Sequence, residues 1–202
     1  RLAGFQYASA DKDLVPVLRE RGDGVEDVLE CAVELIESWQ LQAMSNDLAN
    51  LALDSTAPMR PRIRAGYALA RFGTREARLR LRPLLQHSEH DPEYDLKGLA
   101  LRCLWPDDLT VPELFATLTP RRHNAHYGTY DSFFHELDRR GFDAAGFLIE
   151  GLRWARQHIR RDGDHDPGVR IAKRIAHRAI ESLPDPTIAD GLATLLLDCG
   201  KV

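Results

Sequence analysis

Histidine next to aspartate is the residue pattern in this sequence that comes nearest to catalytic or metal-binding chemistry. The pairs are His90-Asp91 and His165-Asp166. Imidazole and carboxylate groups hold transition metals when several of them converge. Each pair stands directly before a proline, however, where an aspartate accepts the free N–H groups of a starting helix. We therefore predict that both aspartates are N-caps, as is Asp185, which also stands directly before a proline. We retain a metal-dependent hydrolase or hydroxylase as an alternative.

Other patterns with reactive residues lack the additional residues that a functional site needs. His135-Glu136 occurs once, whereas a two-metal hydroxylase site requires several facing copies. Gly200-Lys201 is the single Gly-Lys pair, but Leu195 occupies the place of the first glycine of a phosphate-binding loop. There is no G-x-S-x-G nucleophile motif. The sequence predicts no catalytic residue, no metal site and no cofactor.

Arginine is concentrated between Met59 and Pro83, where eight arginines stand against one acid, Glu76. Such a cluster binds an acidic protein surface, a phosphate group or a nucleic-acid backbone. The arginines that we predict to contact a partner are Arg60, Arg64, Arg71, Arg75, Arg78 and Arg82. An acidic stripe precedes them and comprises Glu26, Glu30, Glu34 and Glu37. The alternative is that both stripes are solvated faces that partly neutralise one another.

Two further features extend the candidate surface. A second basic cluster lies between Arg153 and Arg178, and it favours nucleic-acid binding if it shares a face with the first cluster. The connection from Thr119 to Tyr130 is longer than most connections between helices. Its tyrosines, Tyr127 and Tyr130, are additional candidate partner contacts.

The composition is that of a globular chain. Its 202 residues are 44% hydrophobic and 29% charged, with a formal net charge of −4, which argues against a domain that mainly coats nucleic acid. No run reaches the roughly 18 apolar residues of a membrane span, and no signal peptide is visible. Three widely separated cysteines fit neither a disulfide framework nor a zinc site. We expect a cytoplasmic piece of a longer chain, with no membrane partner.

Apolar residues recur at steps of three and four along most of the chain, which is the spacing of α-helices. The first stripe is Val25, Val28, Ala32, Leu35, Ile36 and Trp39. The same steps recur 144 residues later at Val169, Ala172, Ala176, Ala179, Ile180 and Leu183. Similar stripes between them indicate a repeating pair of helices about 33 to 38 residues long.

We therefore predict an all-α fold without a sheet, since no segment alternates apolar and polar residues over a strand length. Helical pairs of this size stack into an α-α superhelix, a HEAT/armadillo-like solenoid. We expect about five pairs in one right-handed domain over residues 1–202. Pro83 lies inside one predicted helix and should bend or break it, because proline lacks the N–H group and its ring clashes with the preceding turn.

Three segments in the middle of the chain resemble a known family. They are Arg64 to Leu85, Leu96 to Pro120 and Tyr127 to Phe134, and the most specific part is the corner Leu104-Trp105-Pro106-Asp107. These segments resemble the HEAT-like helical-repeat region that follows the nucleotide-binding core in bacterial NACHT-type NTPases of the STAND class. The resemblance implies a sensor or scaffold arm attached to an ATP-driven switch, and it carries over no catalytic residue.

The predicted function is therefore non-catalytic. We expect a protein-interaction or ligand-sensing arm, whose partner is another protein or another domain of the parent chain. The alternative is a nucleic-acid-binding domain similar to the HEAT-like DNA glycosylases, which grip DNA in a basic concavity. That alternative requires the two arginine-rich clusters to lie on one face.

Overall fold

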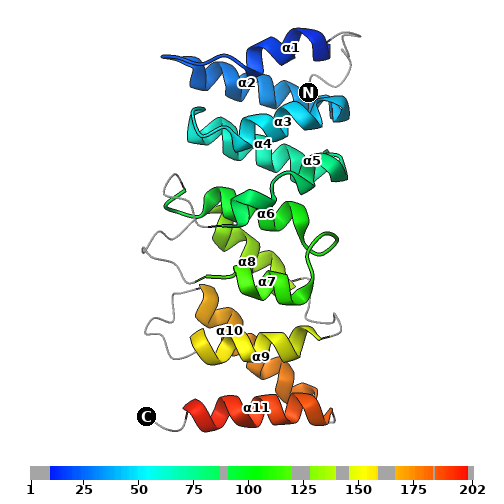
Figure 1. Ribbon diagram of the computed structural model, residues 1–202, viewed down its shortest axis with the longest axis vertical. Helices are drawn as coiled ribbons and strands as arrows, with labels where there is room; N and C mark the ends of the chain where they lie inside the picture. Colours follow the sequence, from blue (N-terminus) through cyan, green and yellow to red (C-terminus); the bar gives the residue numbers. More distant parts are fainter. Residues whose placement is uncertain are drawn as a thin grey trace. The chain divides into compact units, whose positions relative to one another are not determined.

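The computed structural model describes residues 10–86, 91–119, 128–139, 146–158, 167–183 and 185–199. Every regular element in these ranges is a helix (Figure 1), which confirms the all-α prediction. The chain divides into two compact units, Arg1–Asp108 and Leu109–Val202, called unit 1 and unit 2 below. The prediction of a single solenoid domain stays a prediction. None of the helices in the described ranges is long and apolar enough to cross a membrane.

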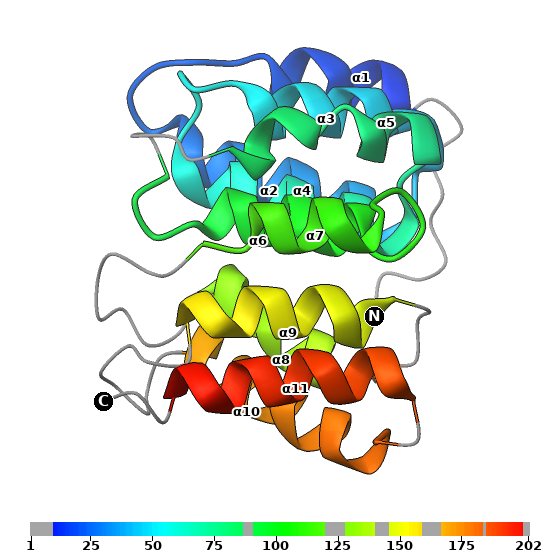
Figure 2. The ribbon, with the colours of Figure 1, turned by 60° about the horizontal axis from the view of Figure 1, so that its bottom comes forward.

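Unit 1 consists of two layers of helices. Its elements are α1 (Ala10–Leu18), α2 (Val25–Ser38), η1 (Gln42–Met44), α3 (Ser45–Leu53), α4 (Met59–Phe72), α5 (Arg75–Leu79), η2 (Arg82–Leu85) and α6 (Asp95–Leu104). Helices α2, α4 and α6 pack side by side in one layer, and α1, α3 and α5 form the other (Figure 2). The core of unit 1 lies between the layers, where Leu48, Leu69 and Leu99 are almost fully buried.

Unit 2 is also built from two layers of helices. Its elements are α7 (Val111–Thr117), α8 (Thr129–Arg139), α9 (Phe147–His158), α10 (Pro167–Glu181) and α11 (Pro186–Cys199). Helix α9 packs against α7 and α11, while α8 packs against α10. The two layers meet mainly between α9 and α10, and Phe115, Phe147 and Trp154 form an aromatic cluster in this core.

Helix α2 confirms the predicted period and corrects the predicted face. The helix buries Val25, Leu29, Ala32, Val33 and Ile36. Val28, which the prediction placed inside, is 44% exposed. The reason is that α2 contacts both α1 and α4, so that the buried arc is centred to one side of the predicted stripe. A helix with apolar residues on two adjacent sides leaves this choice open at the level of sequence.

The predicted correspondence between α2 and α10 is wrong by one residue. Ile180, predicted as a core residue of α10, is 50% exposed. The buried positions match instead at an offset of 143: Leu29 with Ala172, Ala32 with Ile175, and Ile36 with Ala179. Similar spacing of apolar residues therefore identified two helices of one kind without fixing their register.

Two of the predicted aspartate caps lie in the described ranges. Asp185 Oδ1 accepts the N–H groups of Thr187 and Ile188 at 2.8 and 3.4 Å, and Pro186 begins α11, as predicted. Asp91 also serves a helix start, because its Oδ2 accepts the N–H of Lys97 at 3.0 Å. However, α6 begins at Asp95, so that Asp91 acts from outside the N-cap position. Asp166 lies outside the described residues.

Pro83 breaks its helix, as predicted. The expected continuous helix is divided into α5 and the 3-10 turn η2. Arg75 Nε and Arg82 Nη2 on either side of the break donate to Asp108, to its Oδ1 at 2.6 Å and to its carbonyl at 2.5 Å. The carboxylate of Asp108 is fully buried, so these two bonds hold the chain just after α6 against the broken helix.

Gly66 fixes how closely α4 and α6 approach. A Cβ atom at this position would lie 2.8 Å from Leu99 Cδ1 and 3.2 Å from Leu99 Cβ. We expect Gly66→Val to lower the free energy of unfolding of unit 1 by about 2 kcal/mol, because the added carbons have no space. Urea unfolding checks this value. The double variant with Leu99→Ala should cost less than the two single changes added together.

Candidate interaction groove

The arginines of α4 face the acidic stripe of α2. Arg60 Nε lies 3.2 Å from Glu30 Oε1 and 4.0 Å from Glu26 Oε1. Two further ion pairs follow along the helices, Arg64 with Glu34 at 3.6 Å and Arg71 with Glu37 at 2.9 Å. This α2/α4 ladder shows the partial neutralisation of adjacent acidic and basic stripes that the alternative interpretation expected. Arg60, Arg64 and Arg71 are all exposed nevertheless.

The remaining arginines of the predicted surface have other surroundings. Arg75 and Arg82 bind Asp108, as described above. Arg78 is half-buried. Because α4 and α5 belong to different layers, the eight arginines do not make one surface. The predicted patch therefore divides into an α4 part and an α5 part.

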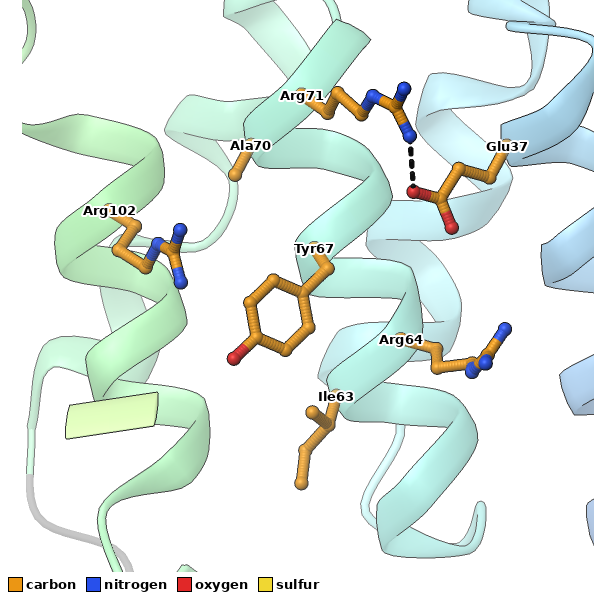
Figure 3. Close-up of a pocket in the computed structure, with 7 residues that line it drawn as sticks. All are labelled: Glu37, Ile63, Arg64, Tyr67, Ala70, Arg71 and Arg102. Carbon is orange, nitrogen blue, oxygen red and sulfur yellow. Dashed lines mark hydrogen bonds and ion pairs between the residues drawn. The ribbon is translucent and has the colours of Figure 1, made fainter. Parts of the chain in front are cut away.

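An open groove of about 580 Å³ follows the exposed face of α4 (Figure 3). It is lined by Glu37, Ile63, Arg64, Tyr67, Ala70, Arg71 and Arg102. Ile63, Tyr67 and Ala70 form an apolar strip along α4, at steps of four and three residues. Arg64 and Arg71 lie on the α2 side of this strip, and Arg102 of α6 lies on the other side.

The groove combines three kinds of interaction. The guanidinium carbon of Arg102 lies 5.1 Å from the ring centroid of Tyr67, within the range of a cation–π contact. Ile63, Tyr67 and Ala70 are each half-buried and still offer apolar surface to solvent. The arginines add charged, planar donors that suit carboxylate and phosphate groups. Aromatic residues and arginine are the side chains most enriched at protein interfaces.

Sequence reasoning found Arg64 and Arg71 but missed Ile63, Tyr67, Ala70 and Arg102. The apolar strip could have been predicted from the sequence, because Ile63, Tyr67 and Ala70 recur at helical spacing beside the buried stripe of Ala65, Ala68 and Leu69. No sequence pattern places Arg102 in the groove, since only the packing of α6 against α4 brings it there.

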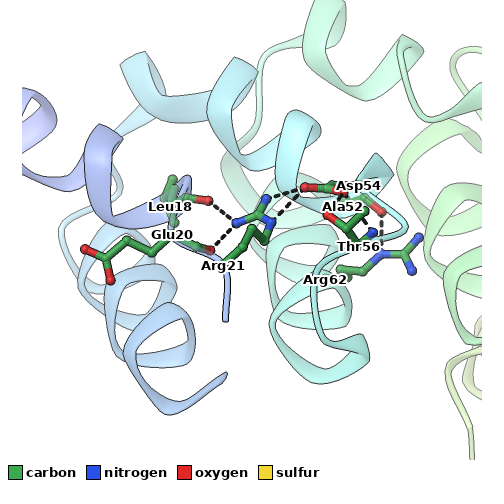
Figure 4. A network of polar contacts seen from close by, with 7 residues as sticks. All are labelled: Leu18, Glu20, Arg21, Ala52, Asp54, Thr56 and Arg62. Carbon is green, nitrogen blue, oxygen red and sulfur yellow. Dashed lines mark hydrogen bonds and ion pairs between the residues drawn. The ribbon is translucent and has the colours of Figure 1, made fainter. Parts of the chain in front are cut away.

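Helix α4 is anchored at its start by arginine contacts to helix ends (Figure 4). Arg62 is almost fully buried, and its Nε donates to the carbonyl of Ala52 at 3.2 Å, in the last turn of α3. Nearby, Arg21 binds both the carbonyl of Leu18 and the carboxylate of Asp54. Partial burial raises the pKa of Asp54, but hydrogen bonds from Thr56 and Arg21 outweigh it and lower that pKa to about 2.

A buried pair of charges supports α6, the other wall of the groove. Lys97 and Asp91 are 2% and 4% exposed. Burial lowers the pKa of Lys97 to about 8, although the charge of Asp91 opposes the shift. Burial likewise raises the pKa of Asp91, against the effect of the N–H groups at the start of α6. The ammonium of Lys97 also lies 5.1 Å from the ring centroid of Tyr94.

The lowered pKa of Lys97 predicts that unit 1 becomes more stable as the pH rises from about 8 to 10.5. In that range the unfolded chain keeps a proton on Lys97 that the folded chain has released, so raising the pH favours the folded state. We expect a gain of about 2 kcal/mol relative to Lys97→Met. Urea unfolding of both proteins at several pH values checks this. Parallel pH profiles would contradict the assignment.

Of the two tyrosine candidates, the one in the described residues does not add to a surface. Tyr130 is fully buried, which corrects its prediction as a partner contact. Its hydroxyl donates to the carbonyl of Thr119 at 2.9 Å and accepts the N–H of the same residue at 3.0 Å. The residue therefore ties the start of α8 to the end of α7. Tyr127 lies outside the described residues.

The basic cluster of unit 2 is divided between two layers. Arg153 and Arg156 are exposed on α9, where Arg153 pairs with Glu150. Helix α10 carries an exposed basic face made of Arg170, Lys173, Arg174 and Arg178. Since α9 and α10 belong to different layers, these two sets do not form one continuous basic face within unit 2.

The described residues do not gather a metal site. No group of three or more His, Cys, Asp or Glu side chains in these ranges is placed to hold a metal ion. His135 is exposed and lies 3.3 Å from Arg170. The His87, His90, His123, His126 and His165 side chains lie outside the described residues. Burial raises the pKa of Cys103 to about 12, despite the opposing charges of Arg78 and Arg102, so this thiol is a core group and not a nucleophile.

The exposed groove of unit 1 is therefore the arrangement of described residues best suited to binding. Comparison with protein-family models, with curated proteins and with solved structures finds no match for this chain.

Proposed function

We propose that this chain is a non-catalytic protein-interaction arm and that it binds its partner through the α4 groove. The observation that carries the proposal is the apolar strip of Ile63, Tyr67 and Ala70 between arginines contributed by α4 and α6. Exposed apolar surface rimmed by charged donors is characteristic of protein-binding sites. The two-layered packing of unit 1 and of unit 2 is compatible with a HEAT-like solenoid, which presents such surfaces in series.

The proposed context is a bacterial NACHT-type NTPase of the STAND class, acting in the cytoplasm. Support for it comes from the resemblance of the middle of the chain to the repeat region of those proteins. The corner from Leu104 to Asp107 follows the end of α6 and is held by Asp108, whose buried carboxylate meets Arg75. In this context the arm senses a protein, or another domain of the parent chain, and passes the binding event to the nucleotide-binding core.

A random peptide library displayed on phage tests the groove as a protein-binding site. Peptides selected on the wild-type chain should bind Ala70→Arg at least tenfold more weakly, because the new side chain fills the open groove. The matched control is Ala116→Arg, the same change at an exposed position of α7 in unit 2. Binding that survives Ala70→Arg, or the failure of any peptide to be selected, would count against the proposal.

Nucleic-acid binding is the second candidate function, and the basic face of α10 is the observation that favours it. Arg170, Lys173, Arg174 and Arg178 follow one exposed side of this helix, so a phosphate backbone could meet several of them together. Titration with duplex DNA at about 50 and 200 mM salt tests this function, because phosphate contacts weaken steeply with salt. Absence of binding at the lower salt concentration would reject it.

A further inference from the structure

We infer that the α4 groove takes a peptide segment in which acidic residues flank an apolar side chain, and that Glu34 and Glu37 of α2 compete with this segment for Arg64 and Arg71. The inference rests on the proposed function and names the class of partner. It also gives the α2/α4 ladder a role in setting the affinity of the groove.

The apolar part of the ligand follows from the strip at the centre of the groove. Ile63, Tyr67 and Ala70 lie on consecutive turns of α4, and all three are half-buried. An apolar side chain laid along them removes surface from water on both molecules, which is the main source of affinity at protein interfaces. The strip is short, so one apolar anchor suffices.

The acidic part follows from the arginines on the two borders. Arg64 and Arg71 are exposed on the α2 side, with side chains 43% and 63% accessible. Arg102 lies across the strip, against the ring of Tyr67. Carboxylates placed before and after an apolar anchor can therefore meet a guanidinium on each side. A lysine-rich segment would instead place like charges together.

The internal competition follows from the partners that two of these arginines already have. Arg71 Nη1 donates to Glu37 Oε1 at 2.9 Å, and Arg64 lies 3.6 Å from Glu34. Glu37 itself lines the groove. Exposed ion pairs of this kind are weak and exchange readily, so a ligand carboxylate can replace the glutamate. The glutamate then lowers the affinity of the ligand without closing the groove.

The ladder also provides a built-in control. Glu26 belongs to the same acidic stripe and carries the same charge, but its partner is Arg60, at 4.0 Å, and neither residue lines the groove. Glu26→Gln and Glu37→Gln therefore change the net charge equally. Only Glu37→Gln releases an arginine that faces the ligand.

Fluorescence polarisation with defined peptides on the full chain tests the inference. The probe is a labelled peptide with two glutamates on each side of one leucine. Its comparison peptides carry glutamines or lysines in place of the glutamates, or serine in place of the leucine. We expect the acidic leucine peptide to bind most tightly. Glu37→Gln should strengthen its binding about twofold to fivefold, and Glu34→Gln/Glu37→Gln more, while Glu26→Gln leaves it unchanged.

Each contrary outcome has a distinct meaning. Equal binding of the glutamine and glutamate peptides would overturn the acidic partner class and leave the proposed groove function standing. Equal strengthening by Glu26→Gln and Glu37→Gln would overturn the competition, because net charge alone would explain it. No binding by any of these peptides would overturn the inference, while the phage selection judges the proposed function separately. Circular dichroism and thermal unfolding confirm that the variants fold.

Discussion

Asp91→Ala is expected to lower the free energy of unfolding of unit 1 by about 4 kcal/mol. The carboxylate is 4% exposed and accepts the N–H of Lys97 at 3.0 Å. Its loss removes the acceptor at the start of α6 and leaves the buried ammonium of Lys97 without this counter-charge. Removing one member of a buried charge pair is costly, because the other charge remains away from water.

Hydrogen exchange measures this effect where it is expected. The amides of α6 should exchange faster in Asp91→Ala, while those of α10 in unit 2 provide an internal reference. The matched control is Asp185→Ala, which removes an exposed cap of α11 and should cost about 1 kcal/mol. An equal cost for the two changes would show that Asp91 acts only as a cap.

Arg64→Glu/Arg71→Glu is expected to weaken binding of an acidic groove ligand roughly 100-fold. Both side chains border the groove, and reversing them places four negative charges, with Glu34 and Glu37, where two ion pairs stood. The helices should persist, because exposed ion pairs contribute little to stability. The measurement is the dissociation constant of a peptide selected on the wild-type chain.

Arg170→Glu/Arg174→Glu is the control for this prediction. It makes the same change of charge at two exposed arginines one turn apart on α10. We expect it to leave peptide binding unchanged and to abolish any binding of DNA. If the α10 variant weakened peptide binding as much as the α4 variant, the result would contradict binding of the peptide in the α4 groove.

Helical periodicity predicted the elements well because burial on one side of a helix imposes spacing that sequence displays directly. The helix at Val25, the break at Pro83 and the cap at Asp185 were all predicted and confirmed. The face of a helix was less certain. Val28 and Leu29 are consecutive apolar residues of α2. Only the positions of α1 and α4 decide that Leu29 is buried and Val28 is exposed.

The candidate site could be predicted only in part, because it depends on which helices share a layer. Arg71 and Arg75 are close in sequence, yet they belong to helices in different layers and bind Glu37 and Asp108. Arg102 is distant in sequence and completes the groove. At Gly73 and Thr74 the chain passes from one layer to the other, and this divides the arginine cluster. A count of charges along the sequence therefore overestimates the size of the basic surface.

The most direct test of the proposed interface is the hydrogen-exchange footprint of a phage-selected peptide on the full chain. Protection is predicted along α4 and the end of α6, around Tyr67 and Arg102, with no change in α10. Protection confined to α10, or to the α1, α3 and α5 layer of unit 1, would contradict it.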